Sequence, residues 1–98
     1  MIVQLQNSHI KNKRYRVILE DGSHYDFGLK GGQTYIDHHD KKKRENYWKR
    51  HLGNKEEEYK ILHLIPSPAT FSAYLLWGRS TDINENIKNL NNLMKNSA

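Results

Sequence analysis

The segment from residue 37 to residue 51 constrains the fold of this chain more than any other. Its sequence is Asp-His-His-Asp-Lys-Lys-Lys-Arg-Glu-Asn-Tyr-Trp-Lys-Arg-His, with six Lys/Arg, three His and two large aromatic residues in fifteen positions. At 3.6 residues per turn, one side of a helix here collects Arg44, Tyr47, Trp48, His51 and Leu52. The opposite side collects Lys42, Lys43, Asn46, Lys49 and Arg50. The pattern predicts a basic helix over residues 34–52 that buries its aromatic side and exposes its cations.

Acidic residues placed before basic ones strengthen this helix prediction. Three pairs stand four residues apart in the favourable order, each worth about 0.2–0.5 kcal/mol: Asp37–Lys41, Asp40–Arg44 and Glu45–Lys49. The Gly53-Asn54 dipeptide is typical of a helix end.

The N-terminal third predicts a small antiparallel sheet. A weak first strand contains Ile2, Leu5 and Ile10, and residues 15–19 form a better one because they are rich in β-branched and aromatic side chains. The Asp21-Gly22 turn predicts a type I′ hairpin. Residues 24–27 then alternate and place Tyr25 and Phe27 on one face. A three-stranded β-meander within residues 1–28 needs a cover to be stable.

Helices supply that cover in the remaining sequence. Residues 55–60 are predicted to be a charged connector or one helical turn, and the apolar run 61–65 fits either a strand or a helix. Ser67 is a candidate N-cap with Pro68 at the first helical position, which begins an apolar helix over residues 67–77. A third, amphipathic helix over residues 81–95 carries one apolar stripe. Its other faces are rich in asparagine, a poor helix former, so packing must hold it.

These elements predict one α+β domain over residues 1–98. It consists of a small N-terminal three-stranded antiparallel β-meander covered by about three α-helices. The expected structural anchors of the core are Phe27, Tyr47, Trp48, Phe71, Leu75, Trp77, Ile83, Ile87 and Leu90. At 98 residues, a single modest core is the norm.

The net charge of +5 lies entirely in the first half of the chain. Residues 1–50 hold eleven Lys/Arg against six Asp/Glu, whereas residues 51–98 hold five of each. Such a half favours nucleic acid, an anionic membrane surface or an acidic protein as partner. The candidate binding face is Lys42, Lys43, Lys49 and Arg50, although these cations could equally serve solubility alone. Tyr47 and Trp48 are expected on the side opposite this face, as core anchors rather than base-stacking platforms.

No cysteine is present, and no apolar run approaches the roughly 20 residues that span a bilayer. The N-terminus lacks the basic and apolar regions of a signal peptide. We therefore expect a soluble protein of intracellular origin without a transmembrane segment.

One spacing suggests metal-dependent chemistry. His38-His39, Asn54 and His63 match the order of HNH-type nucleases, in which a histidine activates water, the asparagine orients it and the last histidine binds a metal. That geometry needs a β-hairpin between the first histidine and the asparagine, where this chain has a helical pattern. A zinc site from Asp37, His38, His39 and His51 is weaker still, because adjacent helical residues diverge. We expect no catalytic residue, metal or cofactor.

Two longer motifs carry a resemblance. The first is Phe27-Gly28 followed by Gly-Gly-Gln-Thr-Tyr-Ile-Asp-His-His-Asp-Lys-Lys-Lys-Arg-Glu-Asn-Tyr over residues 31–47, and the second is Ser-Pro-Ala over 67–69 with Phe-Ser and Tyr-Leu-Leu-Trp-Gly over 71–78. Together they resemble a family of short proteins encoded by nucleocytoplasmic large DNA viruses. The resemblance implies a virus-encoded protein made in host cytoplasm, and it assigns no role to any residue.

The expected function is that of a non-enzymatic structural protein of the virion, such as a minor capsid component. Its partners would be other viral structural proteins, the major capsid protein among them. The alternative is a nucleic-acid-binding accessory or packaging protein that uses the basic helix. A metal-dependent nuclease is the third and weakest hypothesis.

Overall fold

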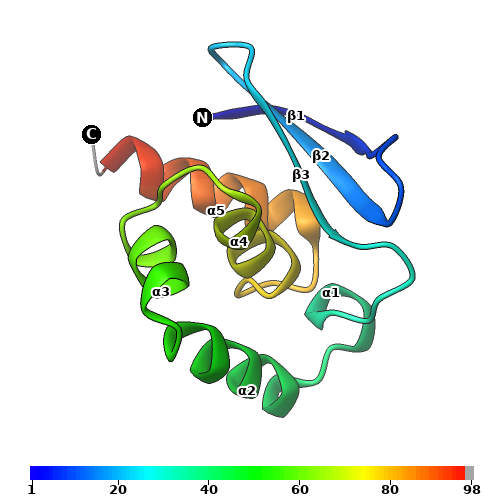
Figure 1. Cartoon of the computed structure of the whole chain (residues 1–98), viewed down its shortest axis with the longest axis vertical. Coiled ribbons are helices and arrows are strands. Elements are labelled where there is room, and N and C mark those ends of the chain that lie inside the picture. Colours follow the sequence, from blue (N-terminus) through cyan, green and yellow to red (C-terminus); the bar gives the residue numbers. More distant parts are fainter. Residues whose placement is uncertain (97–98) are drawn as a thin grey trace.

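The computed structural model describes residues 1–96, and it consists of a sheet followed by a series of helices (Figure 1). The strands are β1 (Ile2–Asn7), β2 (Lys13–Leu19) and β3 (His24–Leu29). The helices are α1 (Tyr35–His38), α2 (Lys41–Leu52), α3 (Lys55–Leu62), α4 (Pro68–Phe71), the π-helix η1 (Ser72–Leu76) and α5 (Ile83–Asn96). The predicted α+β fold class is confirmed.

The sheet is an antiparallel meander in the order β1-β2-β3. The predicted type I′ turn between β2 and β3 is wrong, because Gly22 alone has a positive φ there, 87°. Leu19 N–H donates to the carbonyl of Ser23, so the loop has three residues rather than two. The Asp21 carboxylate accepts from the backbone and the hydroxyl of Ser23, at 2.9 and 2.6 Å. This Asx turn lets glycine alone adopt the left-handed conformation.

The main core lies between the sheet and the segment formed by α4 and η1. Tyr25 and Phe27 project from the same face of β3, and their rings lie 5.4 and 6.0 Å from the ring of Phe71. The fully buried side chains around them include Val17, Leu75, Leu76 and Leu90. Ile83 and Ile87 of α5 pack against this cluster, and Ile87 also lines a hollow beside β1. The helices thus cover one face of the meander, which stabilises a sheet of only three strands.

The apolar helix begins as expected and ends differently. The Ser67 hydroxyl caps α4 by accepting from the backbone of Thr70, with Pro68 at the first helical position. The last turn is a π-helix rather than a continuation of the α-helix, and Trp77 N–H donates to the carbonyl of Ser72 at 3.2 Å. A π turn inserts an extra residue and so rotates the next residues about the helix axis. Trp77 therefore leaves the sheet and lies against α2, where its ring stacks on that of Tyr47.

The basic segment is two helices rather than the single helix predicted over residues 34–52. His39 takes the left-handed conformation, with φ of 58°, and ends α1. Asp40 then caps α2 by accepting from the backbone N–H groups of Lys42 and Lys43, at 3.0 and 3.2 Å. A short acidic side chain competes for backbone donors in this way, and such a cap is worth about 1 kcal/mol.

Two of the three predicted ion pairs are consequently absent. Asp40 is occupied as a cap, and Asp37 pairs with Arg14 of β2 instead of with Lys41. The Glu45–Lys49 pair forms as predicted, at 3.1 Å. The break in the helix therefore replaces two weak surface ion pairs with a stronger N-terminal cap at Asp40 and an ion pair between Asp37 and Arg14 of β2.

The segment predicted to be a connector is the helix α3. The side chain of Asn54 caps it by accepting from the backbone of Glu56 and Glu57. Ile61 is fully buried, whereas Leu62 is 58% exposed. The apolar run 61–65 therefore begins as the last turn of this helix, and Leu64 leaves it with a φ of 54°.

Two asparagines of α5 bind backbone groups outside their own helix. Asn86 is 1% exposed, and its amide nitrogen donates to the carbonyls of Leu75 and Ser80 at 3.0 and 2.8 Å. Its oxygen accepts from the backbone of Ser80 at 2.9 Å. Asn91 accepts from the N–H of Ile2 and donates to its carbonyl, at 2.8 and 3.0 Å. An Asn side chain offers both a donor and an acceptor, as a peptide group does. Asn86 therefore satisfies backbone groups of Leu75 and of the loop at Ser80, and Asn91 satisfies those of Ile2 in β1.

We predict that Asn86→Ala lowers the free energy of unfolding by about 2–4 kcal/mol, because it leaves several buried backbone groups without partners. Urea denaturation followed by circular dichroism measures this. Asn92→Ala is the matched control, since Asn92 is exposed on the same helix. It should be neutral or slightly stabilising, because alanine is the better helix former. Equal effects of the two changes would contradict the structural role of Asn86.

Candidate anion-binding surface

Side chains on the inner face of α2 bind the end of η1. The Tyr47 ring stacks on Trp77 with centroids 4.4 Å apart and planes 6° from parallel. Arg44 Nε donates to the carbonyls of Trp77 and Gly78, at 3.1 and 2.8 Å. Trp48 Nε1 donates to the same Trp77 carbonyl at 2.8 Å. These contacts determine the rotation of α2 about its axis, and hence which of its side chains face water.

Aromatic rings continue this contact along the inner face. The His38 ring lies 5.3 Å from Trp77, and the His51 ring lies 4.0 Å from Tyr47. His51 Nδ1 pairs with the carboxylate of Glu57 on α3. Burial raises the pKa of the Tyr47 hydroxyl well above its usual value, and the negative charge of Glu57 adds to this effect. The Tyr47 hydroxyl is therefore neutral at physiological pH.

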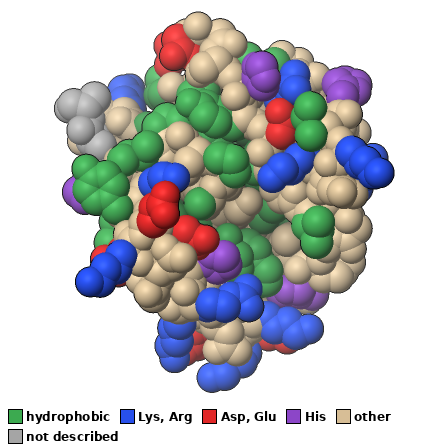
Figure 2. Space-filling model, in the orientation of Figure 1, with side chains coloured by type: hydrophobic (Ala, Val, Ile, Leu, Met, Phe, Trp, Pro, Cys, Tyr) green, Lys and Arg blue, Asp and Glu red, His purple; other side chains and the backbone are tan. Residues whose placement is uncertain are grey.

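The outer face of α2 carries the cations (Figure 2, along the lower edge of the view). All four residues of the predicted binding face are exposed: Lys42, Lys43, Lys49 and Arg50. The structure separates them. Lys43 and Arg50 line a hollow of about 260 Å³ together with Asn46 and His38, Lys49 lines a different groove, and Lys42 lines neither. We call these four exposed cations and Lys41 the α2 ridge.

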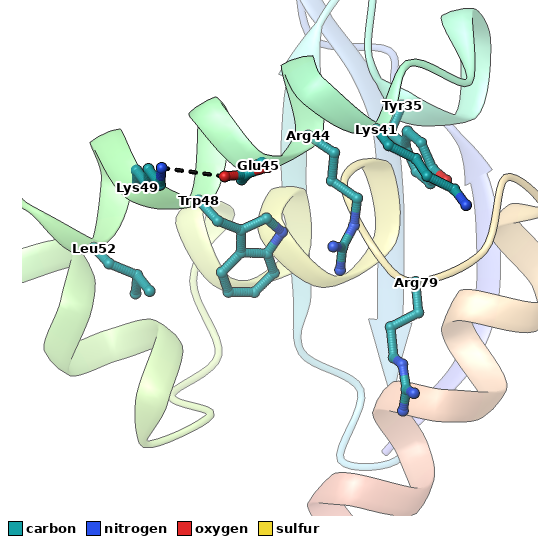
Figure 3. A pocket seen from close by; sticks show the side chains of 8 residues that line it. All are labelled: Tyr35, Lys41, Arg44, Glu45, Trp48, Lys49, Leu52 and Arg79. Carbon is teal, nitrogen blue, oxygen red and sulfur yellow. Dashed lines mark ion pairs between the residues drawn. The ribbon is translucent and has the colours of Figure 1, made fainter.

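A larger groove runs along the other flank of α2, and we call it the Trp48 groove. It has a volume of about 560 Å³ (Figure 3). Its walls are Tyr35, Lys41, Arg44, Glu45, Trp48, Lys49, Leu52 and Arg79. Beyond Trp48 and Arg79, a second hollow of about 320 Å³ reaches Asn89 on α5. Four cations thus meet a single carboxylate here, and Glu45 is already paired with Lys49.

Trp48 has a role that the sequence pattern did not predict. The expectation placed it on the side opposite the cations, but it is half-buried and lines the Trp48 groove beside them. The guanidinium carbon of Arg44 lies 5.9 Å from its ring centre. The spacing of Lys41, Arg44 and Trp48 at three and four residues gives a signal for this flank. Arg79 gives none, because it is distant in sequence and reaches the groove only through the fold.

Helix α1 supplies one residue to each flank of α2, and an ion pair positions it. Arg14 Nη1 and Nη2 donate to the two oxygens of Asp37, at 2.7 and 2.8 Å. The backbone and hydroxyl of Thr34 also donate to Asp37, at 2.9 and 2.8 Å. These bonds, those from Arg14 above all, hold the pKa of the Asp37 carboxyl far below its usual value. Because α1 is attached to β2 in this way, Tyr35 reaches the Trp48 groove and His38 reaches the opposite hollow.

The metal-dependent hypotheses gain no support from the geometry. In the described part of the chain, no three His, Cys, Asp or Glu side chains gather to hold a metal ion. The nuclease spacing requires a hairpin before Asn54, where the structure has α2. Asn54 itself uses its side-chain oxygen to cap α3.

The sequence profile of a family of unknown function (DUF5754) matches residues 3–51, half of the chain. The chain belongs to this family. The matched part contains nearly all of the sheet, α1 and nearly all of α2, and it includes every residue of the α2 ridge. Arg79 of the Trp48 groove and α5, which lines the adjoining hollow, lie outside it. No curated protein and no solved structure matches the chain. Within residues 1–96, every helix is too short or too polar to cross a bilayer.

We predict that Asp37→Asn destabilises the fold most above about pH 5, with the difference from the wild type shrinking as the pH falls. A carboxyl whose pKa is lowered by folding stabilises the protein above its unfolded pKa of about 4, and this contribution is lost as the pH drops through the folded pKa. Thermal unfolding between pH 2 and pH 7 measures it. Glu58→Gln, at an exposed site on α3, should run parallel to the wild type. A gap between Asp37→Asn and the wild type that is constant with pH would contradict the assignment.

Proposed function

We propose that this protein binds nucleic acid through the α2 ridge, as an accessory or packaging protein of a large DNA virus. One observation carries the proposal. Among residues 1–96, Lys41, Lys42, Lys43 and Arg50 form no ion pair with a carboxylate, although all four are exposed on one helix. Solubility alone does not require four unpaired positive charges on one helix.

The shape of the ridge suits a polyanion. A helix of 12 residues is about 18 Å long, so its cations can reach several phosphates of one strand or duplex. Each neutralised phosphate releases counterions, and this supplies most of the free energy of binding without sequence specificity. The positive half of the chain also accelerates encounter with an anionic partner.

The viral origin is part of the proposal. It rests on the two motifs that resemble short proteins of nucleocytoplasmic large DNA viruses. The family match over residues 3–51 includes the first motif, whereas the second motif, which covers α4 and η1, lies outside the match. A protein of this kind would be made in host cytoplasm and carried with the genome into the virion.

The test is a charge reversal on the ridge. We predict that Lys42→Glu, Lys43→Glu and Arg50→Glu together weaken binding to DNA at least about 100-fold, and reduce the slope of log K against log salt by about 2–3. Fluorescence anisotropy at several salt concentrations measures both quantities. The melting temperature should stay close to that of the wild type, because the three side chains are exposed.

A matched control separates the ridge from net charge. Lys11, Lys88 and Lys95 are exposed away from α2, and changing all three to Glu alters the net charge equally. This control should keep most of the affinity. Equal losses in both triple variants would sink the proposal, as would a wild type that does not bind DNA at low salt.

A second candidate function is that of a virion structural component acting through protein contacts, such as a minor capsid protein. A specific observation favours it. Tyr59 and Leu62 are each 58% exposed, and they stand three residues apart on one side of α3. Paired apolar side chains on a helix surface suit a hydrophobic site on another viral structural protein, the major capsid protein for instance.

This candidate predicts that the protein remains with protein shells after virions are digested with nuclease and washed in high salt. Tyr59→Ser with Leu62→Ser should release it, while leaving DNA binding unchanged. Quantitative mass spectrometry of shell and soluble fractions measures the distribution. Release of the wild type by nuclease and salt alone would exclude the structural role and favour nucleic acid as partner.

A further inference from the structure

We infer that the Trp48 groove accepts an unpaired nucleic-acid base, which stacks on the indole of Trp48 while its phosphate meets the surrounding cations. The inference rests on the proposed binding of nucleic acid and names the form that is bound. It assigns a second surface that adjoins the α2 ridge and shares Lys41 and Lys49 with it.

The first argument is the rigidity of the Trp48 ring. Its Nε1 is fixed to the Trp77 carbonyl at 2.8 Å, and it meets the Tyr74 ring in a T-shaped contact, with ring centres 5.5 Å apart and planes at 77°. Figure 3 shows the indole lying between Arg44 and Leu52, broadside to the viewer. A platform that is ordered before binding costs little entropy when a base stacks on it.

The second argument is the set of donors around that platform. Arg44 uses Nε for the backbone of residues 77 and 78, and its two terminal nitrogens make no hydrogen bond within residues 1–96. Its guanidinium carbon lies 5.8 and 5.9 Å from the ring centres of Tyr35 and Trp48, so these nitrogens stand at the edge of the platform. Arg79 is exposed and unpaired within the same residues, as is Lys41. Guanidinium groups bind phosphate through two parallel hydrogen bonds, so Arg44 and Arg79 suit a phosphate next to the stacked base.

The third argument is the continuation of the groove beyond Trp48. The adjoining hollow is lined by Asn89 and by apolar side chains of α5, which include Leu90. Asn89 is half-buried, and its amide offers a donor and an acceptor to the edge of a base. The groove thus combines a stacking face, phosphate donors and an amide, as a nucleotide subsite requires.

The recessed position of Trp48 selects against duplexes. In a duplex, each base is covered on both faces by its neighbours, so no face is available to an indole lying between α2 and α5. An unpaired base, in a single strand or as a free nucleotide, has a free face. The ridge, by contrast, contacts phosphates and does not distinguish the two forms.

The test uses an unstructured oligothymidylate and a duplex of equal length with the full chain. Trp48→Leu should weaken binding to the single strand about 5- to 150-fold, which corresponds to the loss of one base stack. Trp48→Phe keeps an aromatic face but lacks the Nε1 donor that orders the ring, so its affinity should lie between those of Trp48→Leu and the wild type. Arg79→Glu should weaken single-strand binding, and none of the three changes should alter duplex binding more than about twofold. Melting temperatures identify any variant that fails to fold.

A readout on the wild type makes the test independent of variant stability. An oligonucleotide containing 5-iodouracil cross-links under light to an aromatic side chain in contact with the base, and mass spectrometry locates the link. A link at Trp48 supports the inference, whether or not thymidine monophosphate competes for it. Competition by millimolar monophosphate would identify a free nucleotide as a ligand too, and no competition would restrict the site to strands.

Two results would overturn the inference alone. They are cross-links confined to residues outside the groove, and equal single-strand affinity of the wild type and Trp48→Leu. If ridge variants still abolish binding in that case, the proposed function stands without the base subsite. A wild type that binds neither single strand nor duplex would remove both.

Discussion

The structure depends on the contact between α2 and the carbonyl groups at the end of η1. A helix end leaves backbone acceptors without partners, and such groups are costly unless a side chain satisfies them. Arg44 and Trp48 satisfy those of Trp77 and Gly78 from one side. From the other side, Asn86 binds the carbonyl of Leu75. The polypeptide after η1 is therefore held between α2 and α5.

Gly78 allows this arrangement because there is no room for a side chain. A Cβ atom there would lie 2.2 Å from the carbonyl oxygen of Tyr74 and 2.6 Å from Cγ of Asn86. Because neither a backbone oxygen nor a buried, fully bonded amide can move aside, any other residue would separate α5 from η1. The close approach explains why a glycine follows the apolar helix, where the sequence alone suggests only a helix end.

The parts of the fold that follow from local patterns were predictable. Alternation in residues 24–27, the apolar stripe of α5 and the cap at Ser67 are periodic or short-range signals, and each has its expected place. The break before α2 was missed, because an aspartate four residues before a cation fits an ion pair as easily as a cap. Asn86 was missed for a different reason: its partners are backbone atoms of a loop, and the one-dimensional pattern does not identify them. The predicted cations were exposed as expected, but Arg79 and the position of Trp48 depend on tertiary packing.

The basic helix and the backbone acceptors that it binds lie in different halves of the sequence, and this has a consequence for shortened forms of the protein. Residues 1–51 hold the whole sheet and the basic helix, yet every acceptor for Arg44 and Trp48 lies after residue 76. A fragment that stops at residue 51 would present the flat face of Tyr47 and the indole of Trp48 to water, with no tryptophan to stack on. We expect this fragment to aggregate through these rings rather than remain monomeric. The basic helix α2 therefore needs the second half of the chain in order to fold.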